Sequence, residues 1–187
     1  MTAEPLERFL DRPAQLKEPE RTLLPRLPDA TPLILRTARG DDLPELCRLD
    51  KEVFQEVAYP EFLLRQMYDM YADHLLVLDD GTGRLRGYVL AGTTRLDRGS
   101  WILGLCVIQD QRRNGLGREL MVEVLDRLRG CGIEQVRLTV EPANRAAILL
   151  YRGLGFVPEE PDGGLRRDYF GPGMDRLVLR LDLTPAG

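Results

Sequence analysis

An apolar run, a glycine-containing loop and a long amphipathic helix follow one another between Trp101 and Arg129, and this order constrains the fold more than any other sequence feature. The run Trp101 to Ile108 is typical of a buried strand, and the loop Gln111 to Gly117 opens the helix. The apolar residues of the helix recur at helical spacing: Leu116, Leu120, Met121, Val124, Leu125 and Leu128. A helix with one continuous apolar face must bury that face, so we expect it to pack on a sheet.

Further strands and helices surround this unit, so the sequence predicts a mixed α/β domain. Asp42, with Glu45 three residues later, is typical of a capping box that starts a helix. Gly104, inside an apolar strand, indicates a bulge or a close backbone approach. Further strands are expected over 33–38, 75–79, 85–93, 136–140 and 176–183, with a shorter one possible around Phe156. Further helices are expected over 42–54, 60–71 and 144–154.

The first 31 residues differ in composition from the rest of the chain. Prolines stand at positions 5, 13, 19, 25 and 28, and each removes an amide donor and fixes φ. We therefore divide the chain into a Pro-rich N-terminal arm, residues 1–31, and one domain, residues 32–187. The arm either lies across the domain or a partner subunit, or is disordered or loosely docked. With 43% hydrophobic residues in 187, the chain can build a core without disulfides or a structural metal.

Composition excludes several classes of function. The net charge of −4 argues against nucleic acid and anionic membranes as partners, since both need a basic face. His74 and Ser100 are the single histidine and serine, and no Gly-x-Ser-x-Gly elbow surrounds the serine, which argues against a Ser-His-Asp hydrolase. Three cysteines without a Cys-x-x-Cys pair cannot complete a standard zinc site, so we expect no metal. With neither an apolar leader nor a run of about 18 apolar residues, we expect a reduced, cytoplasmic protein.

The loop before the long helix has the chemistry of an anion site. Gly115 and Gly117 let successive backbone N–H groups turn inward beside the positive helix N-terminus, and Arg112 and Arg113 add charge, so a pyrophosphate would find donors there. A plain strand-to-helix turn is the alternative. The loop lacks Gly-Lys-Ser/Thr, which excludes a P-loop. A Rossmann motif would require glycine where Leu120 stands, although Glu141 is spaced like a ribose-binding acid.

A second group of residues lies on the helix after the next strand. Asn144, Ala147 and Tyr151 share one face at about 100° per residue, and Gly155-Phe156 follow. Together the two groups resemble the GNAT N-acetyltransferase superfamily. Its pattern Arg/Gln-x-x-Gly-x-Gly/Ala is matched by Arg112, Gly115 and Gly117, and its pattern Asn-x-x-Ala-x-x-x-Tyr-x-x-x-Gly-Phe is matched throughout. The resemblance covers about residues 32–183, and Gln109 departs from it where many members have proline.

The resemblance implies a fold and a cofactor. The fold is a mixed central sheet of six to seven strands with two splayed parallel strands, here 101–108 and 136–140, and about four flanking helices. Acetyl-CoA is the expected co-substrate, bound between the splayed strands. The residues expected to bind it are Leu105, Cys106 and Val107 through their backbone, the loop Arg112, Arg113, Asn114, Gly115, Leu116, Gly117 and Arg118, and Asn144 on the pantetheine side.

The resemblance also implies direct acyl transfer to an amine. A neutral amine attacks the thioester, a backbone N–H near Val107 stabilises the oxyanion, and Tyr151 protonates the departing thiolate. The general base is less defined. Similar enzymes that act on protein N-termini often carry an acid or histidine five residues before the motif asparagine, where this chain has Thr139. Glu141 is the nearest carboxylate in sequence; a solvated strand end, a water chain or an amine that arrives neutral are the alternatives.

Two aromatic segments are candidates for the acceptor site. Phe54 and Tyr59 lie between the first two helices, and Tyr169 and Phe170 precede the final strand. Both segments resemble those that wall the peptide groove in ribosomal-protein and other N-α-acetyltransferases, so we expect a protein or peptide N-terminus as acceptor. The alternatives are a small amine, such as an antibiotic, polyamine or amino acid, and an acyl-CoA-binding module without turnover. A homodimer is the oligomer we consider.

Overall fold

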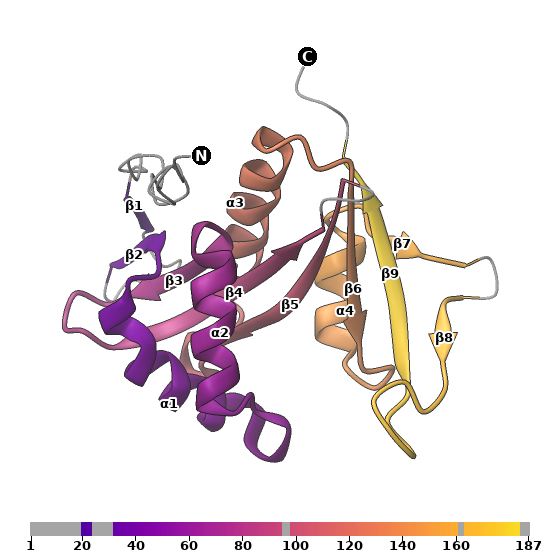
Figure 1. The fold of residues 1–187 in the computed structure, drawn as a ribbon, viewed down its shortest axis with the longest axis horizontal. Coiled ribbons are helices and arrows are strands. Elements are labelled where there is room, and N and C mark those ends of the chain that lie inside the picture. The colour runs from indigo at the N-terminus through magenta and orange to yellow at the C-terminus, as the bar shows by residue number, and fades with distance from the viewer. Residues whose placement is uncertain (1–19, 24–31, 95–97, 161–162, 184–187) are drawn as a thin grey trace, which may run out of the picture.

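The computed structural model describes residues 20–23, 32–94, 98–160 and 163–183 (Figure 1). Nine strands form one mixed sheet in the order β1-β2-β3-β4-β5-β6-β9-β7, with β8 also paired to β9. The strands are β1 (Arg21–Leu23), β2 (Leu33–Thr37), β3 (Leu75–Asp79), β4 (Leu85–Thr93), β5 (Gly99–Val107), β6 (Gln135–Val140), β7 (Val157–Pro158), β8 (Leu165–Arg166) and β9 (Arg176–Asp182). The helices are α1 (Leu43–Phe54), α2 (Glu61–Tyr71), α3 (Leu116–Gly130) and α4 (Arg145–Arg152).

The two faces of the sheet carry different helices (Figure 1). One core cluster holds the apolar face of α3, the side chain of Tyr151 from α4, and inward residues of β6 and β9. The other cluster holds the buried residues of α1 and α2 with Tyr88 of β4 and Cys106 of β5. The amphipathic helix therefore packs on a sheet as its apolar pattern predicts, and α1 and α2 cover the opposite face.

The strands β5 and β6 are parallel neighbours that separate part way along their length. Their pairing runs from Gly99 with Gln135 to Ile102 with Leu138, and then stops. Both strands continue, β5 to Val107 and β6 to Val140, and Figure 1 shows them diverging. The structure thus confirms the expected mixed fold with splayed parallel strands.

A bulge in β5 lies at the point of divergence. Leu90 of β4 pairs with Gly104 but Ala91 pairs with Ile102, so Leu103 is an extra residue on β5. A Cβ built on Gly104 would lie 2.8 Å from the hydroxyl oxygen of Tyr88, closer than real Cβ contacts allow. The bulge that Gly104 predicts therefore occurs, and the group that approaches this glycine closely is the side chain of Tyr88.

The capping box predicted for α1 does not form. The carboxylate of Asp42 accepts a hydrogen bond of 2.6 Å from the backbone N–H of Arg39 and pairs with the guanidinium of Arg36, 6% exposed. Glu45 instead pairs with Arg48 and accepts from the N–H of Leu85. The buried guanidinium of Arg36 needs carboxylate partners, and Asp42 is one of them. A rule based on local residue spacing does not detect this pairing.

Other boundaries differ slightly from the prediction. The sheet has nine strands rather than six to seven. The strand β7 is the short strand expected around Phe156, whereas the three-residue β1 and the two-residue β8 are too short to give a clear pattern. The strand β1 lies within the predicted arm, pairs antiparallel with β2, and is preceded by Glu20; the rest of the arm lies outside the described residues. The last helix ends at Arg152 rather than Leu154. No helix within the described ranges is long and apolar enough to cross a membrane.

The contact at Gly104 gives a test of the fold. We expect Gly104→Ala to destabilise the protein by about 1–3 kcal/mol, because the new methyl overlaps the Tyr88 hydroxyl. Gly130→Ala is the control, since Gly130 ends α3 and a Cβ there has no atom within 4 Å. Denaturant unfolding of both variants measures the difference, and equal midpoints would contradict the close packing.

Candidate active site

A cleft of about 790 Å³ opens between the diverging ends of β5 and β6. Residues 102–107 of β5 form one wall and residues 138–141 form the other. One end is lined by the loop before α3 and by α4, and the opposite end by Val53, Phe54 and Val57 beside α1. Because α1 lies on the other face of the sheet from α3 and α4, the cleft passes through the sheet between its two strands.

Most of the predicted site residues meet in this cleft. Those that line it are Leu105, Cys106, Val107, Arg112, Arg113, Gly115, Leu116, Gly117, Arg118, Glu141, Asn144, Tyr151 and Phe54. Four predicted residues do not line it: Asn114, Tyr59, Tyr169 and Phe170. The side chain of Cys106 points into the α1 and α2 core, where burial raises the pKa of its thiol, so only its backbone is available to the cleft.

The loop before α3 has the backbone of an anion site. Arg113 and Gly115 adopt positive φ, 65° and 80°, so the chain reverses sharply before the helix, whose first N–H groups lack intrahelical acceptors. A Cβ on Gly117 would meet only the side chain of Leu150, at 3.5 Å, so the glycine keeps space open toward the cleft rather than avoiding a clash. Arg112 donates through Nε to the carbonyl of Val107 at 3.0 Å, which joins loop and strand.

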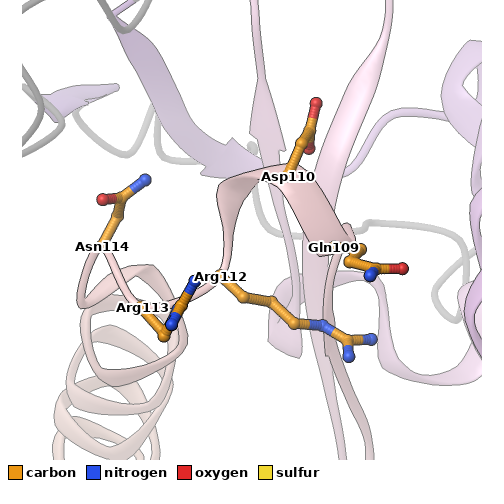
Figure 2. Close-up of a pocket in the computed structure, with 5 residues that line it drawn as sticks. All are labelled: Gln109, Asp110, Arg112, Arg113 and Asn114. Carbon is orange, nitrogen blue, oxygen red and sulfur yellow. The ribbon is translucent and has the colours of Figure 1, made fainter.

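A second hollow of about 700 Å³ lies against the outer side of this loop, and Figure 2 shows its lining residues. They are Gln109, Asp110, Arg112, Arg113 and Asn114. Asn114 is 9% exposed, and its Nδ2 has no hydrogen-bond partner among the described residues. The Oε1 of Gln111, which lines the main cleft, is likewise buried without a partner. The Asn114 Nδ2 is a donor that an anionic ligand at this loop would satisfy, whereas the Gln111 Oε1 is an acceptor that needs an N–H or O–H group.

Tyr151 lies deep in the cleft on α4. The residue is 7% exposed, and its ring packs against Phe156 with 5.8 Å between centroids. Burial raises the pKa of the Tyr151 phenol to about 12, because the charged phenolate is poorly solvated there. The phenol is protonated at neutral pH, as it is at its ordinary pKa near 10, and the raised pKa makes it a weaker proton donor than an exposed tyrosine.

Asn144 and Glu141 have more ordinary surroundings. The Oδ1 of Asn144 accepts a hydrogen bond of 3.1 Å from the N–H of Ala147 and so caps α4, which leaves the side-chain NH₂ facing outward as a donor. Glu141 is exposed just beyond the end of β6. Thr139, which carries no ionisable group, also lines the cleft.

The aromatic residues of the predicted acceptor site have different positions. Phe54 lines the cleft, but the hydroxyl of Tyr59 donates to the carbonyl of Leu103 at 2.8 Å. Tyr169 and Phe170 are exposed and form an edge-to-face pair. Arg176, whose guanidinium lies 5.0 Å from the Phe170 ring centroid, connects this pair to the cleft that it lines.

Sequence reasoning missed Arg176 and Asp50. Arg176 is the first residue of β9, and its sequence neighbours carry no motif that marks it. Asp50 is fully buried on α1, where burial raises the pKa of its carboxyl. A signal for Asp50 was present, because this acid stands among Leu46, Leu49 and Val53 on the apolar face of its helix.

Comparison with known proteins places the chain in a family. The model of the Acetyltransferase (GNAT) family matches residues 43–156, more than half of the chain. An L-methionine sulfoximine/L-methionine sulfone acetyltransferase of Pseudomonas aeruginosa is 33% identical over 116 residues, covering 59% of this chain and 66% of that protein. The ribosomal protein bS18-alanine N-acetyltransferase of Escherichia coli is 36% identical over 69 residues, covering 37% of this chain and 44% of that protein. The chain thus spans just under two thirds of the first relative and less than half of the second.

Solved structures show the same fold. The crystal structure of the Escherichia coli ribosomal-protein-S18-alanine N-acetyltransferase superposes with a TM-score of 0.69 at 23% identity, covering 82% of this chain and 95% of that one. A chain of the NatC complex bound to Gag peptide and CoA gives a TM-score of 0.71 at 19% identity, covering 81% and 99%. With the family match over both motifs, these similarities show that the chain is a member of the GNAT acetyltransferase family.

Proposed function

We propose that this chain transfers the acetyl group of acetyl-CoA directly to a primary amine, and that the amine is the N-terminus of a protein or peptide. The observation that carries the proposal is the cleft through the sheet, which has an anion loop and a buried phenol at one end and an apolar opening beside α1 at the other. Such a passage brings a phosphate-bearing thioester and an amine together from opposite faces.

The cofactor end supports acetyl-CoA. The N–H groups at the start of α3 suit a pyrophosphate, and Arg112, Arg113 and Arg118 provide positive charge on the same loop. The part of β5 from Leu103 to Val107 has left its partner β6, so the edge that faced β6 can pair with the amide groups of a pantetheine arm. The neighbouring NatC structure holds CoA, which agrees with this assignment.

The reaction would use few side chains. A backbone N–H near Val107 would stabilise the oxyanion that forms when the amine attacks the carbonyl. Tyr151, which lines the cleft and is protonated at neutral pH, would donate its proton to the departing thiolate. Glu141 is the carboxylate on the cleft wall from which a water could carry the amine proton away.

The acceptor end favours a peptide over a cationic small molecule. Its described lining is apolar, from Val53, Phe54 and Val57, with one arginine, Arg176. A pocket for a polyamine or an aminoglycoside needs several carboxylates, whereas Glu141 is the one acid among the described residues that line the cleft. Val57, which lines the cleft, is exposed, and so are Tyr169 and Phe170, which Arg176 connects to the cleft. An exposed apolar rim of this kind suits a polypeptide.

An amino-acid-like acceptor is the second candidate. Arg176 could bind a carboxylate next to the reacting amine, and the Pseudomonas aeruginosa relative is named for acceptors of the amino-acid class. The two candidates differ in size and in the group attached to the amine carbon, so one acceptor panel separates them.

The first prediction from the proposed function concerns the acceptor. Incubation with acetyl-CoA should add one acetyl group to peptides with a free N-terminal alanine or methionine and leave the same peptides unmodified when the N-terminus is blocked. Mass spectrometry of the peptides, with L-methionine sulfoximine and spermidine as small-molecule arms, measures this. Acetylation of the small amines alone would contradict the peptide assignment.

Tyr151→Phe tests the proposed general acid. We expect kcat to fall by about 10²- to 10⁴-fold while CoA affinity by calorimetry changes little, because only the proton donor is lost. Tyr68→Phe is the matched control, since the structure gives this half-buried phenol no hydrogen bond within the described ranges and it does not line the cleft. An unchanged kcat in Tyr151→Phe would rule the phenol out as the acid, and no turnover in the wild type would favour the binding module.

The pKa of Tyr151 gives a further prediction. Because the phenol ionises at about 12 in the folded protein and near 10 in the unfolded chain, its contribution to stability falls as the pH rises between these values. In the folded state, the phenolate absorbance of the wild type and of Tyr151→Phe should rise equally near pH 10, and the wild type should show one further group near pH 12. A Tyr151 that ionises at pH 10 would place the ring in solvent instead.

A further inference from the structure

We propose that Asp50 is a positioning residue for acyl transfer: through Tyr59 and Tyr88 it holds the bulge of β5 from which the cleft opens. The inference rests on the proposed function for its kinetic consequence, but its structural part stands on contacts of described residues alone. None of the three residues lines the cleft, so each would act through the backbone of β5.

The carboxylate of Asp50 is fully buried and bound by two neutral donors. Its Oδ2 accepts a hydrogen bond of 2.7 Å from the backbone N–H of Tyr59, and its Oδ1 accepts one from the hydroxyl of Tyr88. No ion pair to Asp50 occurs in the described part of the chain. A buried carboxylate without a cationic partner lowers the stability of the fold. We therefore assign its two hydrogen bonds the role of holding the donor groups of Tyr59 and Tyr88 in place.

The two donors lead to the two residues of the bulge. Tyr59 uses its backbone to bind Asp50 and its hydroxyl to donate to the carbonyl of Leu103, the extra residue of the bulge, at 2.8 Å. Tyr88, fully buried, places its hydroxyl 2.8 Å from the position of a Cβ on Gly104. One carboxylate on α1 therefore fixes two tyrosines, and each tyrosine contacts one residue of the bulge.

The place of the bulge makes these contacts relevant to the reaction. The pairing of β5 with β6 ends at Ile102, directly before Leu103, and Leu103, Gly104 and Leu105 all line the cleft. The direction that the chain takes at Leu103 sets where the N–H groups of the following residues point, including the one near Val107 assigned to the oxyanion. A displacement of about 1 Å at such a group can lower the rate by about 10²-fold.

Tyr59→Phe is the decisive variant. It removes the hydrogen bond to Leu103 and keeps the ring and the backbone contact with Asp50. We expect kcat with a peptide acceptor that has a free N-terminus to fall by about tenfold or more, KM for acetyl-CoA to stay within about twofold, and amide hydrogen exchange of residues 103–107 to become faster. Asp50→Asn, if it folds, should show the same pattern more strongly.

Tyr71→Phe is the matched control. Tyr71 is a half-buried phenol of the same helical layer, and the structure gives its hydroxyl no hydrogen bond among the described residues. The kcat of Tyr71→Phe and the amide hydrogen exchange of its residues 103–107 should equal those of the wild type.

Three results would overturn the proposal. The first two are unchanged amide hydrogen exchange of residues 103–107 in Tyr59→Phe, and a kcat of this variant within about twofold of the wild type in a protein that turns over. A fall in CoA affinity as large as the fall in kcat would also overturn it, because it would indicate general loss of the cleft. Should no acceptor be acetylated by the wild type, the proposed function fails while the exchange comparison still decides whether Asp50 holds the bulge.

Discussion

The end of hydrogen bonding between β5 and β6 is the constraint on which the rest of this molecule depends. Two parallel strands that pair from Gly99 to Ile102 and then separate leave backbone N–H and C=O groups that a continuous sheet would satisfy. These groups stay usable because the strands remain anchored on both sides, β5 by β4 and β6 by β9. The binding surface is therefore made by interrupting regular structure, and the side chains around it refine what enters.

The same interruption explains why stabilising features gather nearby. The bulge at Leu103 bends β5 away from β6, and the carboxylate of Asp50 supplies a fixed point for the tyrosines that hold it. On the other side, Arg112 joins the loop before α3 to the carbonyl of Val107. Both contacts act on β5 rather than β6, so one strand carries most of the geometry that the proposed chemistry requires.

Local patterns predicted those elements whose cause is local. The helical spacing of Leu116 to Leu128 predicts α3, and Gly104 predicts a bulge, because periodicity and glycine act within a few residues. Predictions failed where a distant partner decides. Asp42 leaves its capping role for Arg36, and Tyr59 turns its hydroxyl to Leu103, 44 residues along the chain. The cleft residues of the two motifs could be predicted because their spacing follows a family pattern, whereas Arg176 belongs to no motif. The sequence marks Asp50 only as an acid on an apolar helix face, and its partners Tyr59 and Tyr88 are set by the fold.

A cleft lined from both faces of the sheet has a kinetic consequence. The lining beside α3 and the lining beside α1 lie on opposite sides of the sheet, so the proposed donor and acceptor sites do not overlap. In the proposed reaction, donor and acceptor can then reside together, and neither needs to leave before the other arrives. That reaction would pass through a ternary complex and would not need to store the acyl group on a side chain of the protein between two half-reactions.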